Sequence, residues 1–221
     1  MLDLGCGPGF LAVAFAEYAS DIIGIDPELT MLEEARHYAR AHEATVRFQL
    51  GSSYDLDDDL APLKLVTMGR SFHWMDRKAT LNRLDHLVGP DGAIALFGDQ
   101  HLDLAANRWK KRFEDVLEPY AKTDPAHKLH RSENPDWVPH EEVLLASPFC
   151  QLRRVSVVQK LETPVDCLLD RALSRSTTSP QRLGDAQEDL LAALRALFAE
   201  EAPDGFLREV VEAEALLAFR E

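Results

Sequence analysis

The sequence predicts an α/β fold, built on a parallel sheet with helices on both faces. Two observations predict this class. Short apolar runs with the character of strands alternate, along residues 1–98, with segments whose apolar residues recur at helical spacing. Loops rich in glycine or acidic residues follow several of these runs, in the strand–helix–strand order typical of parallel sheets.

The strands of this first part are expected at residues 1–4, 21–25, 45–50, 63–68 and 93–97. Residues 10–19 are rich in alanine and apolar on more than one face, which favours a buried helix. Asp26 and Pro27 favour the start of the next helix, because Asp is a good N-cap and Pro is favoured at the first helical position. Asp76 is expected to cap a third helix, and the segment Gly89–Gly92 is expected to form a turn.

The pattern changes beyond residue 101. Apolar residues between Trp109 and Tyr120 recur at helical spacing, whereas residues 119–148 are rich in proline and indicate an irregular insertion. A strand is expected at 149–158, two helices at 165–173 and 183–198, and a last strand at 210–219. We therefore divide the chain into 1–98, 99–148 and 149–221, with the last part completing the same domain.

Composition and charge exclude several classes of protein. Hydrophobic residues make up 46% of the chain and charged residues 28%, which is a globular balance, and the formal net charge is −14. Such a charge argues against binding to a nucleic-acid backbone. Apolar runs are too short to cross a bilayer, and the N-terminus has no secretory pattern. Three scattered cysteines suit the reducing cytoplasm.

A glycine-rich turn follows the first strand, in the sequence Asp3-Leu4-Gly5-Cys6-Gly7-Pro8-Gly9. Glycine lets the backbone turn sharply and lets a ligand approach it closely. A nicotinamide-dinucleotide turn would need a glycine at position 10, where Phe10 stands. The alternative is an ordinary turn between strand and helix.

Asp26 ends the second strand, at a position where a carboxylate can accept hydrogen bonds from the two hydroxyls of a ribose. Its alternative role, as a helix N-cap, is compatible with this one. Met31 follows five residues later and fits either a ligand contact or core packing. The loop Gly51–Leu56 and the loop Gly69–Asp76 follow the third and fourth strands. Ligands lie beyond such strand ends in open α/β sheets.

These four motifs, in this order, resemble the class I S-adenosylmethionine (SAM)-dependent methyltransferases, and Phe72-His73-Trp74 resembles their type 11 and trans-aconitate methyltransferase-like group. The resemblance is specific over residues 1–98. It implies a Rossmann-like, mostly parallel sheet with an antiparallel last strand, SAM as cofactor, and residues 1–98 as the SAM-binding core. Ser52 stands where relatives usually have an aspartate that binds adenine, so we expect a weaker contact there.

The resemblance, read position by position, implies a set of site residues. Cofactor-binding residues would be Asp3, Gly5, Cys6, Gly7, Gly9, Asp26, Pro27, Met31, Ser52, Ser53, Tyr54, Arg70 and Ser71. His73 is the candidate general base, and substrate contacts would be Phe72, Trp74, Trp109 and Arg175. Each has a plainer alternative: His73 and Trp74 brace their loop, and the arginines form surface ion pairs. We expect no metal, because His127, His130 and His140 lack matching ligand spacing.

We expect methyl transfer from SAM to a small-molecule acceptor, with no nucleic-acid or membrane partner. The oligomeric state and the acceptor stay open. Two alternatives remain: a SAM-binding domain with little or no turnover, and, disfavoured by Phe10, an NAD(P)-dependent oxidoreductase. Relatives carry a helical segment before the first strand, so we also expect a chain extended upstream to bind SAM more tightly than this one.

Overall fold

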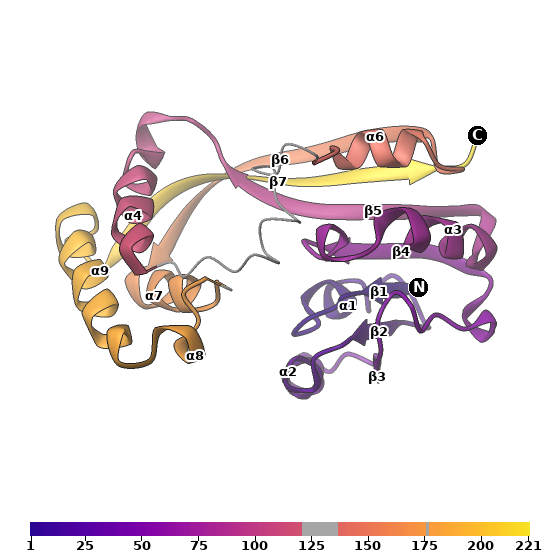
Figure 1. The fold of residues 1–221 in the computed structure, drawn as a ribbon, viewed down its shortest axis with the longest axis horizontal. Coiled ribbons are helices and arrows are strands. Elements are labelled where there is room, and N and C mark those ends of the chain that lie inside the picture. The colour runs from indigo at the N-terminus through magenta and orange to yellow at the C-terminus, as the bar shows by residue number, and fades with distance from the viewer. Residues whose placement is uncertain (121–136, 176) are drawn as a thin grey trace. The chain divides into compact units, whose positions relative to one another are not determined.

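The fold is described from a computed structural model, which describes residues 1–120, 137–175 and 177–221. Its strands form one seven-stranded sheet in the order β3-β2-β1-β4-β5-β7-β6. The strands are β1 (Leu2–Leu4), β2 (Ile23–Asp26), β3 (Arg47–Leu50), β4 (Leu63–Gly69), β5 (Val88–His101), β6 (Gln151–Pro164) and β7 (Phe206–Phe219). The sheet is mostly parallel with one antiparallel strand, β7, as the sequence predicts (Figure 1).

The described helices are α1 (Phe10–Ala14), α2 (Leu29–Ala41), α3 (Arg77–Leu87), α4 (Trp109–Leu117), α6 (His140–Leu145), α7 (Val165–Leu173), α8 (Pro180–Leu183) and α9 (Gln187–Glu201). The expected order of strands and helices in residues 1–98 is confirmed. Asp76 caps α3 as predicted, because its Oδ1 accepts a hydrogen bond from the Ala79 N–H at 3.0 Å.

Three local predictions are wrong. The helix expected from Asp26 begins at Leu29, with Glu28 as its N-cap, because the Asp26 carboxylate accepts the Glu28 N–H while Asp26 still belongs to β2. The helix expected over residues 10–19 ends at Ala14, and tighter turns follow it. The turn expected at Gly89–Gly92 lies inside β5 as a shift in register against β4.

The chain divides into two compact units. Among the described residues, the first contains 1–98, 137–156 and 214–221, and the second contains 99–120, 157–175 and 177–213. The expected division into 1–98, 99–148 and 149–221 stays a prediction. Residues 121–136, including His127 and His130, lie outside the described part of the chain.

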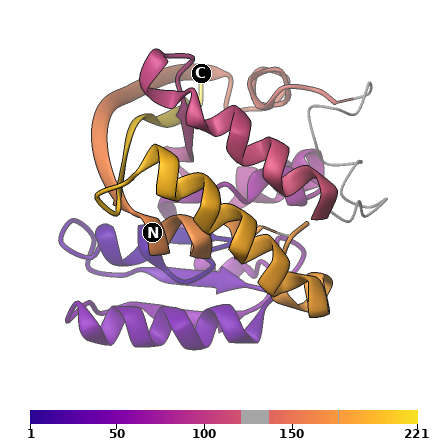
Figure 2. The ribbon, with the colours of Figure 1, turned by 90° about the vertical axis from the view of Figure 1, so that its left-hand side faces the viewer.

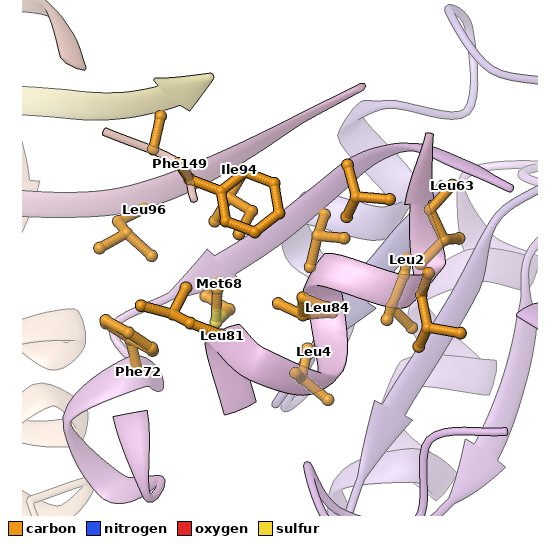
Figure 3. Close-up of a cluster of buried hydrophobic side chains, with 14 of the residues drawn as sticks. Leu2, Leu4, Leu63, Met68, Phe72, Leu81, Leu84, Ile94, Leu96 and Phe149 are labelled. Carbon is orange, nitrogen blue, oxygen red and sulfur yellow. The ribbon is translucent and has the colours of Figure 1, made fainter. Parts of the chain in front are cut away.

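The core of the first unit lies between the sheet and α3. In β1, all three residues are buried, and Leu2 and Leu4 pack with Met68, Leu84 and further apolar side chains (Figure 3). Within this unit α1 packs on α2 and α3 packs on α6. Complete burial makes each of these side chains worth roughly 1.5–3 kcal/mol. This core fixes the ends of β1, β2 and β4, from which the candidate site projects.

The second unit has its own core. Helices α4 and α9 lie side by side in it (Figure 2). Trp109 and Phe113 from α4 pack with Phe198 from α9, with ring centroids about 6 Å apart. Their spacing along each helix puts them on one face, which is the pattern the sequence predicts for both helices.

A buried carboxylate joins the strands of the second unit. Glu209 on β7, only 1% exposed, accepts hydrogen bonds from His101 at 2.6 Å, from Thr163, and from both terminal nitrogens of Arg171 at 2.9 and 3.0 Å. Burial alone would raise the pKa of this carboxyl, but the bonds from Arg171, His101 and Thr163 outweigh it and lower the pKa to about 2. The Glu209 network therefore holds its negative charge at neutral pH.

Candidate active site at the strand ends

The glycine turn after β1 has a backbone that favours glycine. Gly5, Gly7 and Gly9 have φ values of 69°, 52° and 82°, in the left-handed region. A Cβ added to Gly7 would meet nothing within 4 Å, whereas one added to Gly5 would lie 2.5 Å from the Cβ of Ser71. The turn is therefore packed tightly at Gly5 and open above Gly7, which leaves room for a ligand to approach the main chain.

Asp26 connects this turn to β2. Its side chain is only 7% exposed in total. Its Oδ2 accepts the Gly7 N–H at 2.8 Å, and its Oδ1 accepts the Glu28 N–H at 2.9 Å. Each oxygen keeps a second lone pair, so the carboxylate can still accept hydrogen bonds from a ligand. The structure brings Asp26 and the glycine turn together, as the sequence predicts for an adenosine ligand.

Cys6 lies inside the turn and is buried. Burial raises the pKa of its thiol, and the nearby carboxylates of Asp3 and Asp26 raise it further. Cys6 is therefore a neutral packing group, with its Sγ 3.7 Å from the Gly7 carbonyl oxygen.

Asp3 points into the protein. It is 1% exposed, and its two oxygens accept hydrogen bonds from the Thr67 hydroxyl at 2.8 Å and the Ala12 N–H at 3.2 Å. Burial raises its pKa to about 6 against the opposing effect of these two bonds, and Asp26 adds to the rise. Sequence reasoning missed Thr67, although a polar residue within the apolar run Leu63–Met68 was a usable signal.

The loop after β3 closes on itself through a carboxylate that sequence reasoning missed. Asp55 Oδ2 accepts hydrogen bonds from the Ser52 hydroxyl at 2.7 Å and the Ser52 N–H at 2.8 Å, which lowers the pKa of Asp55. Ser52 Oγ in turn accepts the Tyr54 N–H at 3.2 Å. Ser53 is buried, and Arg83 holds the end of the loop by donating to the Leu56 carbonyl oxygen. The proton of the Ser52 hydroxyl is thus committed to Asp55.

Large apolar side chains stand exposed around these strand ends. Tyr54 is 74% exposed, Phe10 59% and Met31 41%. Pro27 is exposed as well. Exposed apolar groups beside an open glycine turn and a hydrogen-bonding carboxylate are what an adenosine-containing cofactor requires, so the residues present fit SAM.

The loop after β4 carries the remaining candidates of the first unit. Arg70 has a φ of 55°, which is rare for a residue with a side chain, and its N–H donates to the Phe97 carbonyl oxygen at 3.0 Å. Ser71 donates through Oγ to the Leu4 carbonyl oxygen at 2.7 Å, so its hydroxyl fastens the loop to β1. The rings of His73 and Trp74 lie 5.0 Å apart, and Trp74 is 48% exposed.

Phe72 differs from its neighbours. It is 2% exposed and belongs to the core, with its ring 5.1 Å from that of His140. The side chain therefore packs inside the first unit, while Trp74, two residues on, faces outward. One side chain of this loop is buried and the other exposed, because the short 3₁₀ turn Phe72–Trp74 points successive side chains in different directions.

Trp109 and Arg175 lie in the second unit and are engaged there. Trp109 is 3% exposed in the core, and its Nε1 has no hydrogen-bond partner within the described residues. Arg175 makes a two-pronged ion pair with Glu114, at 2.7 and 2.8 Å, and its guanidinium lies 5.1 Å from the centre of the Phe113 ring. Both side chains thus have structural contacts. For Arg175 the contact is an ion pair, which is the alternative to substrate binding that the sequence left open.

His140 contacts Arg77, and its Nδ1 lies 3.2 Å from Arg77 Nη1. Burial lowers the pKa of His140, and the nearby charge of Arg77 lowers it further. Within residues 1–120, 137–175 and 177–221, no three His, Cys, Asp or Glu side chains gather as a metal site would need. In the same ranges, no helix combines the length and apolar character needed to cross a bilayer.

Comparison with known proteins assigns this arrangement to a family. Residues 1–92 match a family model described as a methyltransferase domain. An uncharacterized methyltransferase of Schizosaccharomyces pombe is 30% identical over 104 residues, which are 42% of this chain and 37% of that protein. An uncharacterized methyltransferase of Mycobacterium tuberculosis is 24% identical over 185 residues, which are 83% of this chain and 68% of that protein.

The fold is shared as well. A protein of Anaeromyxobacter dehalogenans whose structure is assigned as a type II methyltransferase superposes with a TM-score of 0.63 at 21% identity, over 99% of this chain and 88% of that one. At this identity the likeness establishes the fold alone. The matching segment, the relatives and the shared fold support a class I SAM-dependent methyltransferase. The matched segment contains the glycine turn, Asp26, and the loops after β3 and β4. The chain aligns with little more than a third of the length of the Schizosaccharomyces pombe relative.

Proposed function

We propose that this methyltransferase transfers a methyl group from SAM to a small-molecule acceptor. The observation that supports the proposal most strongly is the pairing of the open glycine turn with Asp26, whose Oδ2 accepts the Gly7 N–H at 2.8 Å. This pairing places a hydrogen-bonding carboxylate directly beside accessible backbone, as a bound adenosine needs.

Each part of the site has a role in this proposal. SAM supplies an activated methyl group when bound. Asp26 accepts hydrogen bonds from the ribose hydroxyls, and the main chain at Gly7 lies against the methionine part of the cofactor. Met31 and Tyr54, both exposed, cover the adenine ring, and the Ser52–Asp55 pair fixes the loop that faces it.

The acceptor side is proposed to involve His73, Trp74 and Arg70, on the loop after β4. An exposed indole favours a neighbouring cation, and a guanidinium suits an acidic acceptor. His73 would receive a proton if the acceptor must lose one. The net charge of −14 favours a small molecule over a nucleic acid.

We also propose membership of the type 11 group, on the Phe72-His73-Trp74 sequence, and a reducing cytoplasmic location, in keeping with three free cysteines.

A second candidate is a SAM-binding domain with little or no turnover. The observation in its favour is Ser52, whose hydroxyl donates to Asp55 in place of a charged adenine ligand. A nicotinamide-dependent oxidoreductase is disfavoured, because Phe10 occupies the position of the third glycine that its turn would need.

Calorimetry with SAM and its demethylated product tests the proposal, using Asp26→Asn and, as a matched control, Glu28→Gln. Both changes remove one negative charge, but only Asp26 lies at the turn, whereas the Glu28 side chain is exposed. We expect Asp26→Asn to weaken binding by about tenfold or more, since a charged hydrogen bond contributes about 1.5–3 kcal/mol. Glu28→Gln should bind as the wild type does.

If the protein binds neither SAM nor its demethylated product, the proposal is refuted. Binding by both, with no methyl transfer to any member of a panel of metabolite acceptors, would favour the domain without turnover. Quenching of NADH fluorescence would support the oxidoreductase instead.

A further inference from the structure

Two buried polar side chains face each other under the glycine turn. Asp3 on β1 and Thr67 on β4 are direct neighbours in the parallel pairing of these strands. Asp3 is 1% exposed and Thr67 is fully buried. The Thr67 hydroxyl donates to Asp3 Oδ1 at 2.8 Å and lies at 3.5 Å from the Leu2 carbonyl oxygen, so its proton goes to the carboxylate.

The other oxygen of Asp3 reaches the far side of the turn. Asp3 Oδ2 accepts the N–H of Ala12, in α1, at 3.2 Å. The carboxylate thus joins β1, which enters the turn, to α1, which leaves it. Thr67 pairs with Ala95 on β5 on its other side, and its hydroxyl contacts the Asp3 carboxylate and the Leu2 carbonyl oxygen, so we expect it to act on the turn through Asp3.

We propose that Thr67 is a positioning residue, which keeps the Asp3 carboxylate ionised and oriented so that Asp3 holds the glycine turn in the shape that binds the cofactor. The inference rests on the proposed function for the identity of the ligand. The contact between Thr67 and Asp3 and its effect on the turn do not depend on it.

The electrostatics of the site make the hydroxyl important. Burial raises the pKa of Asp3 to about 6, the bonds from Thr67 and Ala12 oppose the rise, and the charge of Asp26 on β2 adds to it. The other titratable group at the site is the Cys6 thiol, which stays neutral because its own pKa is raised. Burial therefore brings the pKa of Asp3 towards neutral pH, and loss of the Thr67 donor would raise the protonated fraction there.

Protonation of Asp3 would weaken its hold on Ala12, because a neutral carboxyl is a poorer acceptor than a carboxylate. The Gly5–Gly9 turn lies between the two anchored points. Its three left-handed glycines give it many alternative conformations, so loss of one anchor should lower the fraction of molecules with the turn ready to bind.

The test uses the full chain and the variants Thr67→Val and Thr67→Ser. Thr67→Val keeps the shape and removes the hydroxyl, and Thr67→Ser restores it. The matched control is Thr80→Val, because Thr80 is 2% exposed on α3 and its hydroxyl has no partner within the described residues. The probe is S-adenosylhomocysteine, and its affinity is measured by calorimetry from pH 5 to pH 8.5.

For the wild type we expect the affinity to fall as pH drops through about 6, the pKa of Asp3. For Thr67→Val we expect this midpoint to rise by about one pH unit, so that affinity falls about threefold at pH 6.5 and little at pH 8. Thr67→Ser and Thr80→Val should keep the wild-type midpoint. The Thr67 hydroxyl donates to Asp3 and not to Asp26, so a moved midpoint identifies Asp3.

Two measurements without ligand separate this inference from the proposed function. Carbon NMR of the Asp3 carboxyl gives its titration midpoint directly, and hydrogen exchange at the Ala12 N–H reports the anchor. We expect Thr67→Val to raise the midpoint and to speed Ala12 exchange at pH 6.5 more than at pH 8.

An unmoved carboxyl midpoint in Thr67→Val would overturn the inference. So would an affinity loss of equal size at every pH, since that is the effect of a merely structural role. Failure of all chains to bind S-adenosylhomocysteine would refute the proposed function, while the two measurements without ligand would still decide the role of Thr67.

Discussion

The buried Glu209 network gives a stability prediction whose size follows from the structure. Glu209 accepts hydrogen bonds from His101, Thr163 and Arg171, and its pKa falls from 4.5 to about 2 on folding. Each pKa unit corresponds to about 1.4 kcal/mol, so the ionised carboxylate stabilises the second unit by about 3 kcal/mol at neutral pH. Glu209→Gln removes the charge and should cost about this amount at pH 7.

The sign of the pH dependence is fixed by the direction of the shift. A lowered pKa means that the unfolded chain takes up a proton before the folded one does as pH falls. The contribution of Glu209 is therefore complete above pH 4.5 and is lost as pH drops towards 2. The difference between wild type and Glu209→Gln should shrink to about 1 kcal/mol at pH 3.

Native-state hydrogen exchange at the Val210 N–H measures this directly, because that amide lies next to Glu209 and donates to Asn107 Oδ1 at 2.9 Å. We expect Glu209→Gln to speed its exchange by about two orders of magnitude at pH 7. The control is Glu162→Gln, which breaks an exposed ion pair with Arg208 and should have little effect. An equal effect of Glu209→Gln at pH 7 and pH 3 would refute the reasoning, since the charge would then play no part.

Two further predictions concern the first unit. Gly9→Ala puts a Cβ on a residue with φ of 82°, at 3.0 Å from Ala35 and Phe48 side-chain atoms, and should lower the free energy of unfolding by at least about 1 kcal/mol. The control Gly98→Ala has open space around its new Cβ and should leave the free energy of unfolding unchanged. Equal melting temperatures of the two variants would contradict this prediction. Phe72→Ala should lower the free energy of unfolding in urea by about 3–5 kcal/mol, because Phe72 lies in the core. Trp74→Ala, at a half-exposed position, should alter turnover and leave stability nearly unchanged. The reverse pattern would assign Phe72 to the acceptor pocket.

The order of elements could be predicted because it depends on local patterns. Apolar runs, helical spacing and the N-cap Asp76 each act over a few residues, and each gave the correct element. The turn at Gly89–Gly92 failed for a tertiary reason: its residues have turn character, but β4 offers a partner, and β5 absorbs them as a shift in register.

In the candidate site, too, some features could be predicted from the sequence and others depend on tertiary packing. Asp26 and the glycine turn could be expected side by side, because parallel strands end at one edge of the sheet. Which way a side chain points could not. Phe72 and Trp74 are both large aromatics in one short loop, yet one is buried and one exposed, and packing into the core of the first unit decides which. Thr67 was missed because its partner Asp3 lies on another strand, and pairing of this kind leaves little trace in a single sequence. Asp55 was missed although its partner Ser52 lies in the same loop.

The buried thiol of Cys6 makes the state of the glycine turn readable by chemistry. An alkylating reagent needs an exposed thiolate, and Cys6 is both enclosed and held protonated, whereas Cys167 is exposed. In one sample, Cys167 should be labelled at once, and Cys6 only as often as the turn opens. The ratio of the two labelling rates thus reports how often the glycine turn opens, without an added probe.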